Sequence, residues 1–335
     1  MRALAARQHF AVPGEVPADL PVEVVPVEPP SPWRARIGRW RRPRGELAEG
    51  PFAARVRELA GEVDVVHLEE TDTAWCDLGV STPSLVHIHY LVHRDRSRGR
   101  PWQRSFREVL EFELGERAAI RRHLYLVASS PLVAEGLRTF TRLGTEIVVA
   151  PLSLDPALYA PARLDGPPTA GILGTAAWPP TEAAMRTLVD HVWPLVRERV
   201  PDGRLVVAGR GADRLGLAGD GVEVLGEFAS APDLLRRLSV LAFPLERGSG
   251  MKVKVLEAMA SGVPVVTTPA GAEGIDRGVA VHQDVERIAD DTARLLLDEA
   301  ERRERGSQAR SAFEELYAPE PATRPLVELY RRMSG

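Results

Sequence analysis

The stretch GSGMKVKVLEAMASGVPVVTT, residues 248–268, is the most informative part of this 335-residue chain. It contains both lysines of the chain, Lys252 and Lys254, whereas all the other residues among its 43 lysines and arginines are arginine. A glycine-rich turn opens the stretch, a helix is expected over 251–261, and the β-branched run 263–267 predicts a buried strand. A turn, a helix and a buried strand in this order are typical of a parallel α/β sheet.

The turn before this helix predicts an anion site. Backbone N–H groups and the positive end of the helix dipole favour a phosphate there, and lysine supplies a compact charge. If the helix begins near Gly250, then Gly250, Lys254 and Glu257 share one face, while Lys252 points elsewhere. That face suits a nucleoside diphosphate, with phosphates on the turn and Lys254 and ribose hydroxyls on Glu257. A solvated helix with a Lys254–Glu257 pair is the alternative, and this stretch leaves both open.

Strand-like runs alternate with helical periodicity along the chain, which predicts parallel sheets with right-handed crossovers. A break rich in proline, residues 151–168, separates two halves. The expected strands are 3–6, 22–27, 63–67, 84–87, 124–128 and 147–149 in the first half, and 169–173, 204–208, 222–225, 240–243 and 263–267 in the second. The expected helices are 102–121, 181–199, 232–238, 251–261, 285–297 and 317–333.

Composition limits the function classes. The formal charge of −4 gives no field that would recruit nucleic acid, so no nucleic-acid partner is expected. A single cysteine, Cys76, excludes internal disulfides and any multi-cysteine metal site. Residues 1–10 lack the apolar core of a signal peptide, and no run approaches the roughly 18 apolar residues of a membrane span. We therefore expect a cytoplasmic enzyme of two domains.

The second half resembles the retaining nucleotide-sugar glycosyltransferases, specifically glycosyltransferase family 4. The resemblance rests on the glycine-rich turn followed by LEAMA (256–260), SGVPVV (261–266) and GAEG (271–274), with a strand, turn and helix at 171–181. It spans roughly residues 169–317 and is looser in the first half. It implies two Rossmann-like domains facing across a cleft, the GT-B fold, with ligands at the carboxyl ends of the strands.

The resemblance also implies a domain division. Residues 1–155 form a shortened acceptor-side domain, residues 156–316 the donor-binding domain, and residues 317–335 a helix returning to the first domain. Many members carry two glutamates eight positions apart around the turn, but here Ser249 takes the place of the first. The usual basic pair after the first donor-domain strand is absent, so Lys254 is the expected substitute. Arg210 is a second candidate for the diphosphate, with a solvated loop arginine as the alternative.

The strongest feature of the first half is VHIHYLVH, residues 86–93. In a strand, His87 and His89 share a face at a spacing compatible with a metal site, but we see no carboxylate or cysteine nearby to complete one. The resemblance implies instead that His89 ends a strand and faces the donor sugar. We expect His87 to be buried and His93 to lie on a loop. His9, after the first strand, is expected to be a loop residue.

A basic patch containing tryptophan runs from Trp33 to Arg44. It predicts peripheral contact with the inner face of a membrane, or with an anionic acceptor, and a surface loop without a special role is the alternative. The acceptor itself stays open among a glycan, a lipid-linked molecule and a natural-product scaffold.

The sequence thus predicts a retaining glycosyltransferase that moves a sugar from a nucleoside-diphosphate donor without a metal or other cofactor, since no D-x-D element is present. A non-catalytic nucleotide-sugar-binding subunit and a sugar-nucleotide epimerase of the same fold are the alternatives. The residues expected to act in catalysis are His89 and Lys254, and those expected to bind the donor are Gly174, Thr175, Arg210, Ser249, Gly250, Met251, Lys252 and Glu257.

Overall fold

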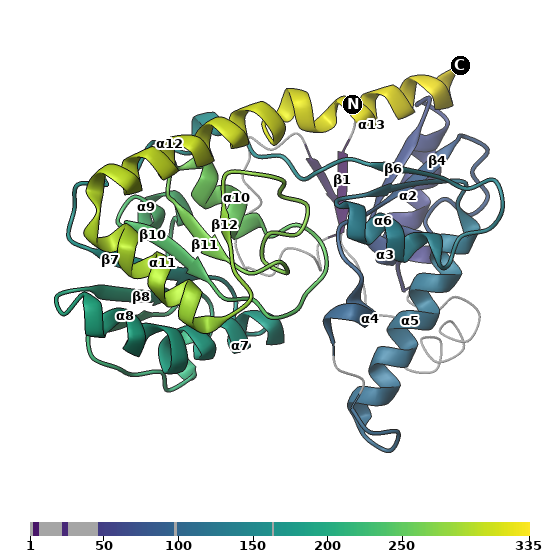
Figure 1. Cartoon of the computed structure of the whole chain (residues 1–335). Helices are drawn as coiled ribbons and strands as arrows, with labels where there is room; N and C mark the ends of the chain where they lie inside the picture. Colours follow the sequence, from purple (N-terminus) through teal and green to yellow (C-terminus); the bar gives the residue numbers. More distant parts are fainter. Residues whose placement is uncertain (1–2, 7–21, 26–45, 97–98, 163) are drawn as a thin grey trace. The chain divides into compact units, whose positions relative to one another are not determined.

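The structure is a computed structural model that describes residues 3–6, 22–25, 46–96, 99–162 and 164–335. Its internal packing divides the chain into two units (Figure 1). Unit 1 comprises Met1–Val149 with Pro325–Gly335, and unit 2 comprises Ala150–Arg324. Two sequence predictions, the loop position of His9 and the basic patch at residues 33–44, lie outside the described residues.

Unit 1 contains two parallel sheets with helices between the strands. Four strands pair in the order β3-β4-β5-β6, and β1 pairs with β2. The strands are β1 (Ala3–Ala6), β2 (Val22–Val25), β3 (Val66–Glu69), β4 (Ser84–Ile88), β5 (Tyr125–Ala128) and β6 (Glu146–Val149). The helices are η2 (Glu46–Ala48), α2 (Pro51–Ala60), α3 (Glu70–Thr73), α4 (Val92–Asp95), α5 (Arg104–Arg122) and α6 (Pro131–Arg138).

Unit 2 is built on a parallel sheet in the order β12-β11-β10-β7-β8-β9. Its strands are β7 (Thr169–Leu173), β8 (Arg204–Ala208), β9 (Val222–Leu225), β10 (Val240–Phe243), β11 (Val265–Thr267) and β12 (Ala280–Val281). Its helices are η3 (Pro156–Leu158), α7 (Pro179–Thr187), η4 (Leu188–Val192), α8 (Trp193–Arg199), η5 (Ala212–Arg214), α9 (Ala231–Leu235), α10 (Val253–Ala260), α11 (Val285–Leu297) and α12 (Glu299–Leu316). The last helix, α13 (Pro319–Ser334), begins in unit 2 and ends in unit 1.

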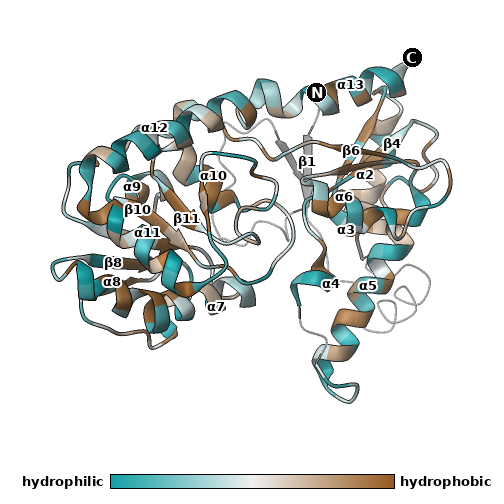
Figure 2. Ribbon diagram, viewed as in Figure 1, coloured by the Kyte–Doolittle hydropathy of each residue, from teal (hydrophilic) through white to brown (hydrophobic). Residues whose placement is uncertain are grey.

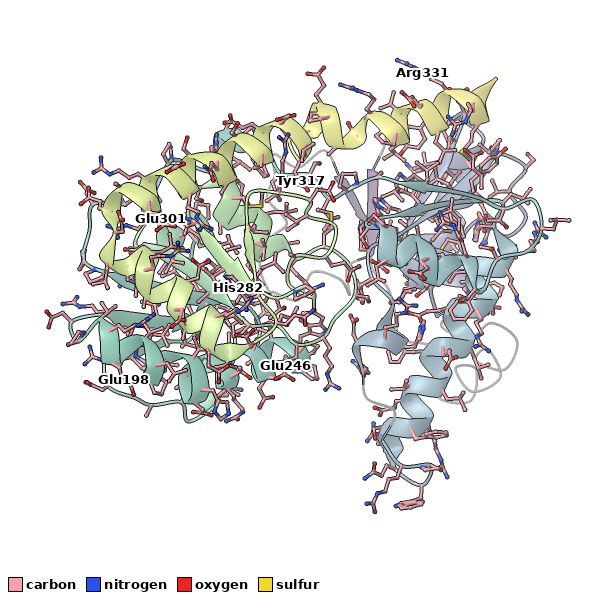
Figure 3. The ribbon with its side chains drawn as sticks, in the orientation of Figure 1. Glu198, Glu246, His282, Glu301, Tyr317 and Arg331 are labelled. Carbon is pink, nitrogen blue, oxygen red and sulfur yellow. The ribbon has the colours of Figure 1, made fainter. Side chains whose placement is uncertain are left out.

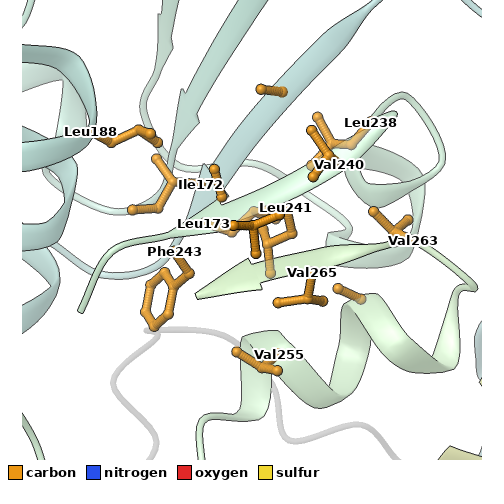
Figure 4. Packing of buried hydrophobic residues seen from close by; sticks show 14 of the residues in the cluster. Ile172, Leu173, Leu188, Leu238, Val240, Leu241, Phe243, Val255, Val263 and Val265 are labelled. Carbon is orange, nitrogen blue, oxygen red and sulfur yellow. The ribbon is translucent and has the colours of Figure 1, made fainter. Parts of the chain in front are cut away.

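The core of unit 2 explains why its strands were predictable. β7 and β10 are buried at every position, because helices cover both faces of the sheet and leave continuous apolar runs. Figure 4 shows Leu241 and Phe243 of β10 and Val265 of β11 beside Val255 of α10. Figure 2 shows β8, β10 and β11 in brown, whereas teal covers much of α12.

Some elements differ from the sequence prediction. The helix expected over 181–199 is a continuous helical run, but it widens into a π-turn, η4, just before Pro194, which has no N–H to donate. α12 and β12 were not predicted, because α12 is polar over most of its surface and β12 has only two residues. No helix of the described residues is both long enough and apolar enough to cross a membrane.

Cys76 is a buried thiol of unit 1. Its Sγ donates to the Leu47 carbonyl oxygen at 3.4 Å, and burial, assisted by Asp77, raises its pKa to about 12. The reactive thiolate is therefore scarce at neutral pH, which agrees with an inert structural cysteine.

Two glycines bring the carboxyl ends of β7 and β8 close together. The Gly174 N–H, after β7, donates to the Ala208 carbonyl oxygen of β8 at 3.0 Å. The Gly209 N–H, after β8, donates to the Leu225 carbonyl oxygen of β9 at 3.2 Å. Gly209 has a φ of +136°, and a Cβ added there would lie 1.7 Å from the Gly174 carbonyl oxygen. Only glycine therefore fits position 209 without moving backbone.

We predict that Gly209→Ala lowers the free energy of unfolding by at least about 1–3 kcal/mol, the scale of overpacking and backbone strain. Urea denaturation followed by circular dichroism measures it. Gly216→Ala is the matched control, because Gly216 has a φ of +65° but no atom within 4 Å of an added Cβ. Gly216→Ala should lower the free energy of unfolding by only about 1 kcal/mol, the cost of local backbone strain. Equal losses in the two variants would contradict the close approach.

Candidate functional site

The strand order of unit 2 has one switch point. After β7 the chain adds β8 and β9 on one side, then returns to place β10, β11 and β12 on the other. β7 and β10 are parallel neighbours, so their carboxyl ends meet at the same edge. Ligands of open α/β sheets bind outside the carboxyl ends at such a point. The candidate site is therefore formed by residues 174–178, after β7, and residues 244–252, after β10.

These two loops contact each other through Trp178. A Cβ added to Gly248 would lie 3.1 Å from Cη2 of the Trp178 indole, so the ring packs directly on the turn's backbone. On the same loop, Gly174 is half-buried and Thr175 is exposed, with its Oγ1 accepting from the Ala177 N–H at 3.4 Å. Sequence reasoning missed Trp178, although it stands within the segment that carried the resemblance.

Lys252 folds back into the turn rather than away from it. Its Nζ donates to the Gly248 carbonyl oxygen at 3.4 Å and also to the Gly250 carbonyl oxygen. Glu273 lies opposite, with its Oε2 3.9 Å from the lysine Nζ, and each side chain is only 5% exposed. The two buried charges thus compensate each other inside the turn, and Lys252 is a support of the loop.

Glu273 also fixes the backbone of the turn directly. Its Oε1 accepts from the Gly250 N–H at 2.8 Å, in a buried position. Gly250 has a φ of +77° and Gly248 one of +137°, which other residues adopt only with strain. The expectation that the Gly250 N–H is open to a phosphate is therefore wrong for this arrangement, because a carboxylate already occupies it.

The helix after the turn begins later than expected. α10 starts at Val253, with Lys252 as its N-cap residue, so Gly250 lies outside the helix. The side chains of Ser249 and Met251 are buried, and the Met251 Sδ accepts from the Leu152 N–H at 3.2 Å. The N–H groups of Val255 and Leu256 donate to the Lys252 carbonyl oxygen, but those of Val253 and Lys254 come too early in α10 to find an acceptor within the helix, which keeps this end favourable for an anion.

Lys254 and Glu257 form the ion pair that the sequence left open as the alternative. Nζ of Lys254 lies 2.7 Å from Oε2 of Glu257, one helical turn further along α10. The Tyr159 hydroxyl donates to Oε1 of Glu257 at 3.2 Å, and burial together with Glu257 raises the pKa of Tyr159 to about 12. Glu257 is buried, whereas Lys254 is 32% exposed. The pair is thus only partly accessible to solvent, and the lysine is its more exposed member.

Arg210 lies on the loop after β8. Its guanidinium is exposed and pairs with Glu227 at 3.1 Å, while its carbonyl oxygen accepts from the Ala176 N–H at 2.9 Å. Its backbone therefore supports the loop after β7, and its side chain makes an exposed ion pair. Glu246, labelled in Figure 3, and Arg247 are exposed on the loop after β10.

A surface hollow of about 970 Å³ lies along α11, away from these loops. Its charged groups pair with one another: His282 lies 3.0 Å from Asp291, and Arg199 lies 2.6 Å from Asp290 (His282 is labelled in Figure 3). Asp291 also binds Arg294. Because these charges are already balanced, we place the candidate site at the switch point and not in this hollow.

In unit 1, His89 follows β4. Nε2 of its ring lies 2.7 Å from Oε2 of Glu69, and its backbone N–H donates to Oε1 of Glu70 at 3.1 Å. Burial lowers the pKa of His89, but the hydrogen bond that the ring donates to Glu69, together with the charge of Glu70, outweighs burial and raises the pKa. His87 is buried, as expected. The expectation that no carboxylate lies near these histidines is wrong, because Glu69 reaches them from the neighbouring strand.

His93 lies on the short helix α4 instead of a loop, and its Nδ1 is 2.5 Å from Oε2 of Glu116. Sequence reasoning also missed Tyr159, for which no local signal exists. It noted Glu273 only as part of the GAEG motif, without assigning it a contact.

Comparison with known proteins places the fold. Residues 167–298 match the model of a family described as glycosyl transferases group 1. The whole chain is similar in structure to Anabaena HepE in complex with UDP and glucose, with a TM-score of 0.63 and 16% identity, covering 93% of this chain and 86% of that one. No curated protein matches the chain.

Two further solved structures show the same likeness. Sucrose-phosphate synthase from Thermosynechococcus elongatus has a TM-score of 0.63 and 16% identity, covering 85% of this chain and 81% of that one. A UDP-forming α,α-trehalose-phosphate synthase from Burkholderia xenovorans has a TM-score of 0.61 and 15% identity, covering 84% and 78%. The predicted α/β class with the GT-B fold is confirmed.

Replacing Lys252 should destabilise the protein more than replacing Lys254. Lys252→Met removes a buried cation that binds two carbonyl oxygens and balances Glu273, so we predict a loss of about 1.5–3 kcal/mol in the free energy of unfolding. Lys254→Met removes a partly exposed ion pair and should cost about 1 kcal/mol or less. Urea denaturation of both variants measures the difference. If Lys254→Met costs as much as Lys252→Met, Lys252 is not the support of the turn.

Proposed function

We propose that this chain is a retaining glycosyltransferase that transfers a sugar from a nucleoside-diphosphate sugar to an acceptor nucleophile. The observation that carries the proposal is the Lys254–Glu257 pair, held on α10 beside a braced glycine turn at the switch point of unit 2. The match of residues 167–298 to group 1 glycosyl transferases supports it. So does the likeness in fold to a protein solved with UDP and glucose.

In this proposal the donor's diphosphate binds Lys254 and the backbone amides of Met251 and Lys252, which directly precede α10. Lys254 is the cation there that solvent reaches, since the charge of Lys252 is committed to the turn. When the ammonium turns toward a phosphate, Oε2 of Glu257 becomes available to a ribose hydroxyl, while Tyr159 keeps Oε1 in place. One ion pair thus supplies both a cation for the phosphates and a carboxylate for the ribose.

The resemblance to retaining glycosyltransferases implies the chemical step. The bond between the sugar's anomeric carbon and the diphosphate breaks, and the acceptor oxygen forms its bond on the same face. The departing phosphate takes the acceptor's proton, so no protein nucleophile is required. Lys254 and the amides at the start of α10 stabilise the charge that develops on the diphosphate. In this proposal the transfer itself requires no metal.

Other assignments remain predictions. Gly174 and Thr175 lie on the loop after β7, and Arg210 is available as a further cation if it leaves Glu227. The role of His89 toward the donor sugar rests on the resemblance, and the contacts described for it lie within unit 1. The acceptor class stays open, as does a cytoplasmic site of action with membrane contact through residues 33–44.

We predict that Lys254→Ala weakens binding of UDP by about 1–3 kcal/mol, the scale of a charge-assisted hydrogen bond, and barely affects uridine. Isothermal titration calorimetry on both ligands measures this difference. Arg186→Ala is the matched control, because Arg186 is also a helical cation of unit 2 in an ion pair, with Glu182. Unchanged UDP affinity in Lys254→Ala would overturn the phosphate assignment.

The reaction class is tested with a panel of nucleoside-diphosphate sugars. We expect a product whose anomeric configuration equals that of the donor, by NMR, and a lower turnover in Glu257→Gln, which loses the charged acceptor for the ribose. An inverted product would contradict retention. Donor binding without hydrolysis or transfer would favour the non-catalytic subunit, and an epimerised donor would favour the epimerase.

A further inference from the structure

Three side chains converge at the carboxyl ends of β3 and β4 in unit 1. Nε2 of His67 lies 3.2 Å from Oε1 of Glu69, and Nδ1 of His87 lies 3.8 Å from Oε2 of the same carboxylate. One ligand atom from each of these residues lies within 4.8 Å of the other two. Two imidazole nitrogens and a carboxylate oxygen are a ligand set that zinc uses in proteins. Among the described residues, this group of His67, Glu69 and His87 is the metal-compatible cluster that the structure brings together.

The strand register creates the cluster. His67 and Glu69 are two residues apart in β3. Successive side chains of a strand point to opposite faces, so these two project to the same face. β4 runs parallel to β3, with Glu69 directly opposite His87, so the second histidine arrives beside the carboxylate. The ring centroids of His67 and His87 are 5.6 Å apart. The three side chains therefore belong to two adjacent strands, and the backbone hydrogen bonds between these strands hold them near one another without a metal.

The spacing is close to what a metal requires. Zinc binds nitrogen and oxygen at about 2.0–2.2 Å, so tetrahedral ligand atoms lie about 3.3–3.6 Å apart. Closing the widest pair from 4.8 Å to that spacing takes at most about 1.5 Å, divided between two side chains. Small rotations of the side chains can supply it, and Glu69, which is 56% exposed, has room to move. The same exposure gives an ion a path from solvent.

The groups around the cluster have the arrangement of an outer shell. Nδ1 of His67 is hydrogen-bonded to the Tyr330 hydroxyl, which leaves Nε2 as the nitrogen that faces Glu69. A metal on Nε2 requires the proton on Nδ1, and the tyrosine oxygen accepts it. Metal-bound histidines commonly make such a contact through their second nitrogen. On the other side, His89 holds Oε2 of Glu69 at 2.7 Å.

Charge also favours a cation at this position. Three imidazoles surround one carboxylate, since His67, His87 and His89 all approach Glu69. A divalent ion can bind the carboxylate and imidazole nitrogens at the same time, which no single proton can do.

We propose that His67, Glu69 and His87 form a binding site for a divalent transition-metal ion of the zinc class, with Tyr330 as a positioning residue. The three ligands leave one coordination position for water or another donor, as in zinc sites that are not purely structural. The site lies in unit 1, and its test measures metal binding without reference to activity.

The test uses the full chain, free of any affinity tag and stripped with a chelator. We expect one equivalent of Zn²⁺ by isothermal titration calorimetry, a raised thermal midpoint with Zn²⁺, and visible d–d absorption with Co²⁺ typical of a four- or five-coordinate site. Absence of the Co²⁺ absorption in the unmodified chain would overturn the proposal, and this measurement depends on no variant folding.

Variants then assign the ligands. His67→Ala and Glu69→Gln should lose the single equivalent of Zn²⁺, and Tyr330→Phe should weaken it by about 10–100-fold, the usual effect of an outer-shell contact. His93→Ala and His282→Ala are matched controls, because each removes a histidine paired with a single carboxylate, Glu116 or Asp291. Undiminished binding in both His67→Ala and Glu69→Gln, or a loss confined to the control variants, would overturn the assignment.

Discussion

The hydrogen bond from the Gly250 N–H to Glu273, with Lys252 closing the same turn from inside, is the interaction on which the candidate site depends. The loop after β10 must pass through left-handed backbone at Gly248 and Gly250, and such a path has no regular hydrogen-bonding pattern to hold it. The buried Lys252 and Glu273 charges replace that pattern. Because both are out of water, each requires the other, and the turn is fixed as a unit.

This arrangement divides two neighbouring lysines between two roles. Lys252 is buried in the turn, whereas Lys254, two residues later in the first turn of α10, is 32% exposed. The change from loop to helix at Val253 sends the two side chains in different directions. A turn held by buried contacts, with a partly exposed cation beside it, is suited to a charged ligand, since the support does not have to reorganise when the ligand binds.

Unit 1 uses a different principle, in which a sheet supplies the geometry. Parallel pairing of β3 with β4 sets Glu69 beside His87, and alternation along each strand brings His67 and His89 to the same face. The register of a sheet leaves little freedom in these positions. The cluster is thus a consequence of strand pairing and requires no local motif.

The sequence by itself determined the α/β class and most strands of both units, and it offered the pairing of Lys254 with Glu257 as one of two interpretations. These features are local: buried parallel strands are continuous apolar runs, and residues one helical turn apart meet. It placed β3 at 63–67, following the apolar run, whereas the strand begins at Val66, where pairing with Ser84 starts. That shift removed Glu69 from the predicted strand, so the carboxylate beside His87 was missed. Only the tertiary structure decided that contact, the fold of Lys252 onto Glu273 and the packing of Trp178 on Gly248, because each joins residues distant in sequence through register or backbone direction.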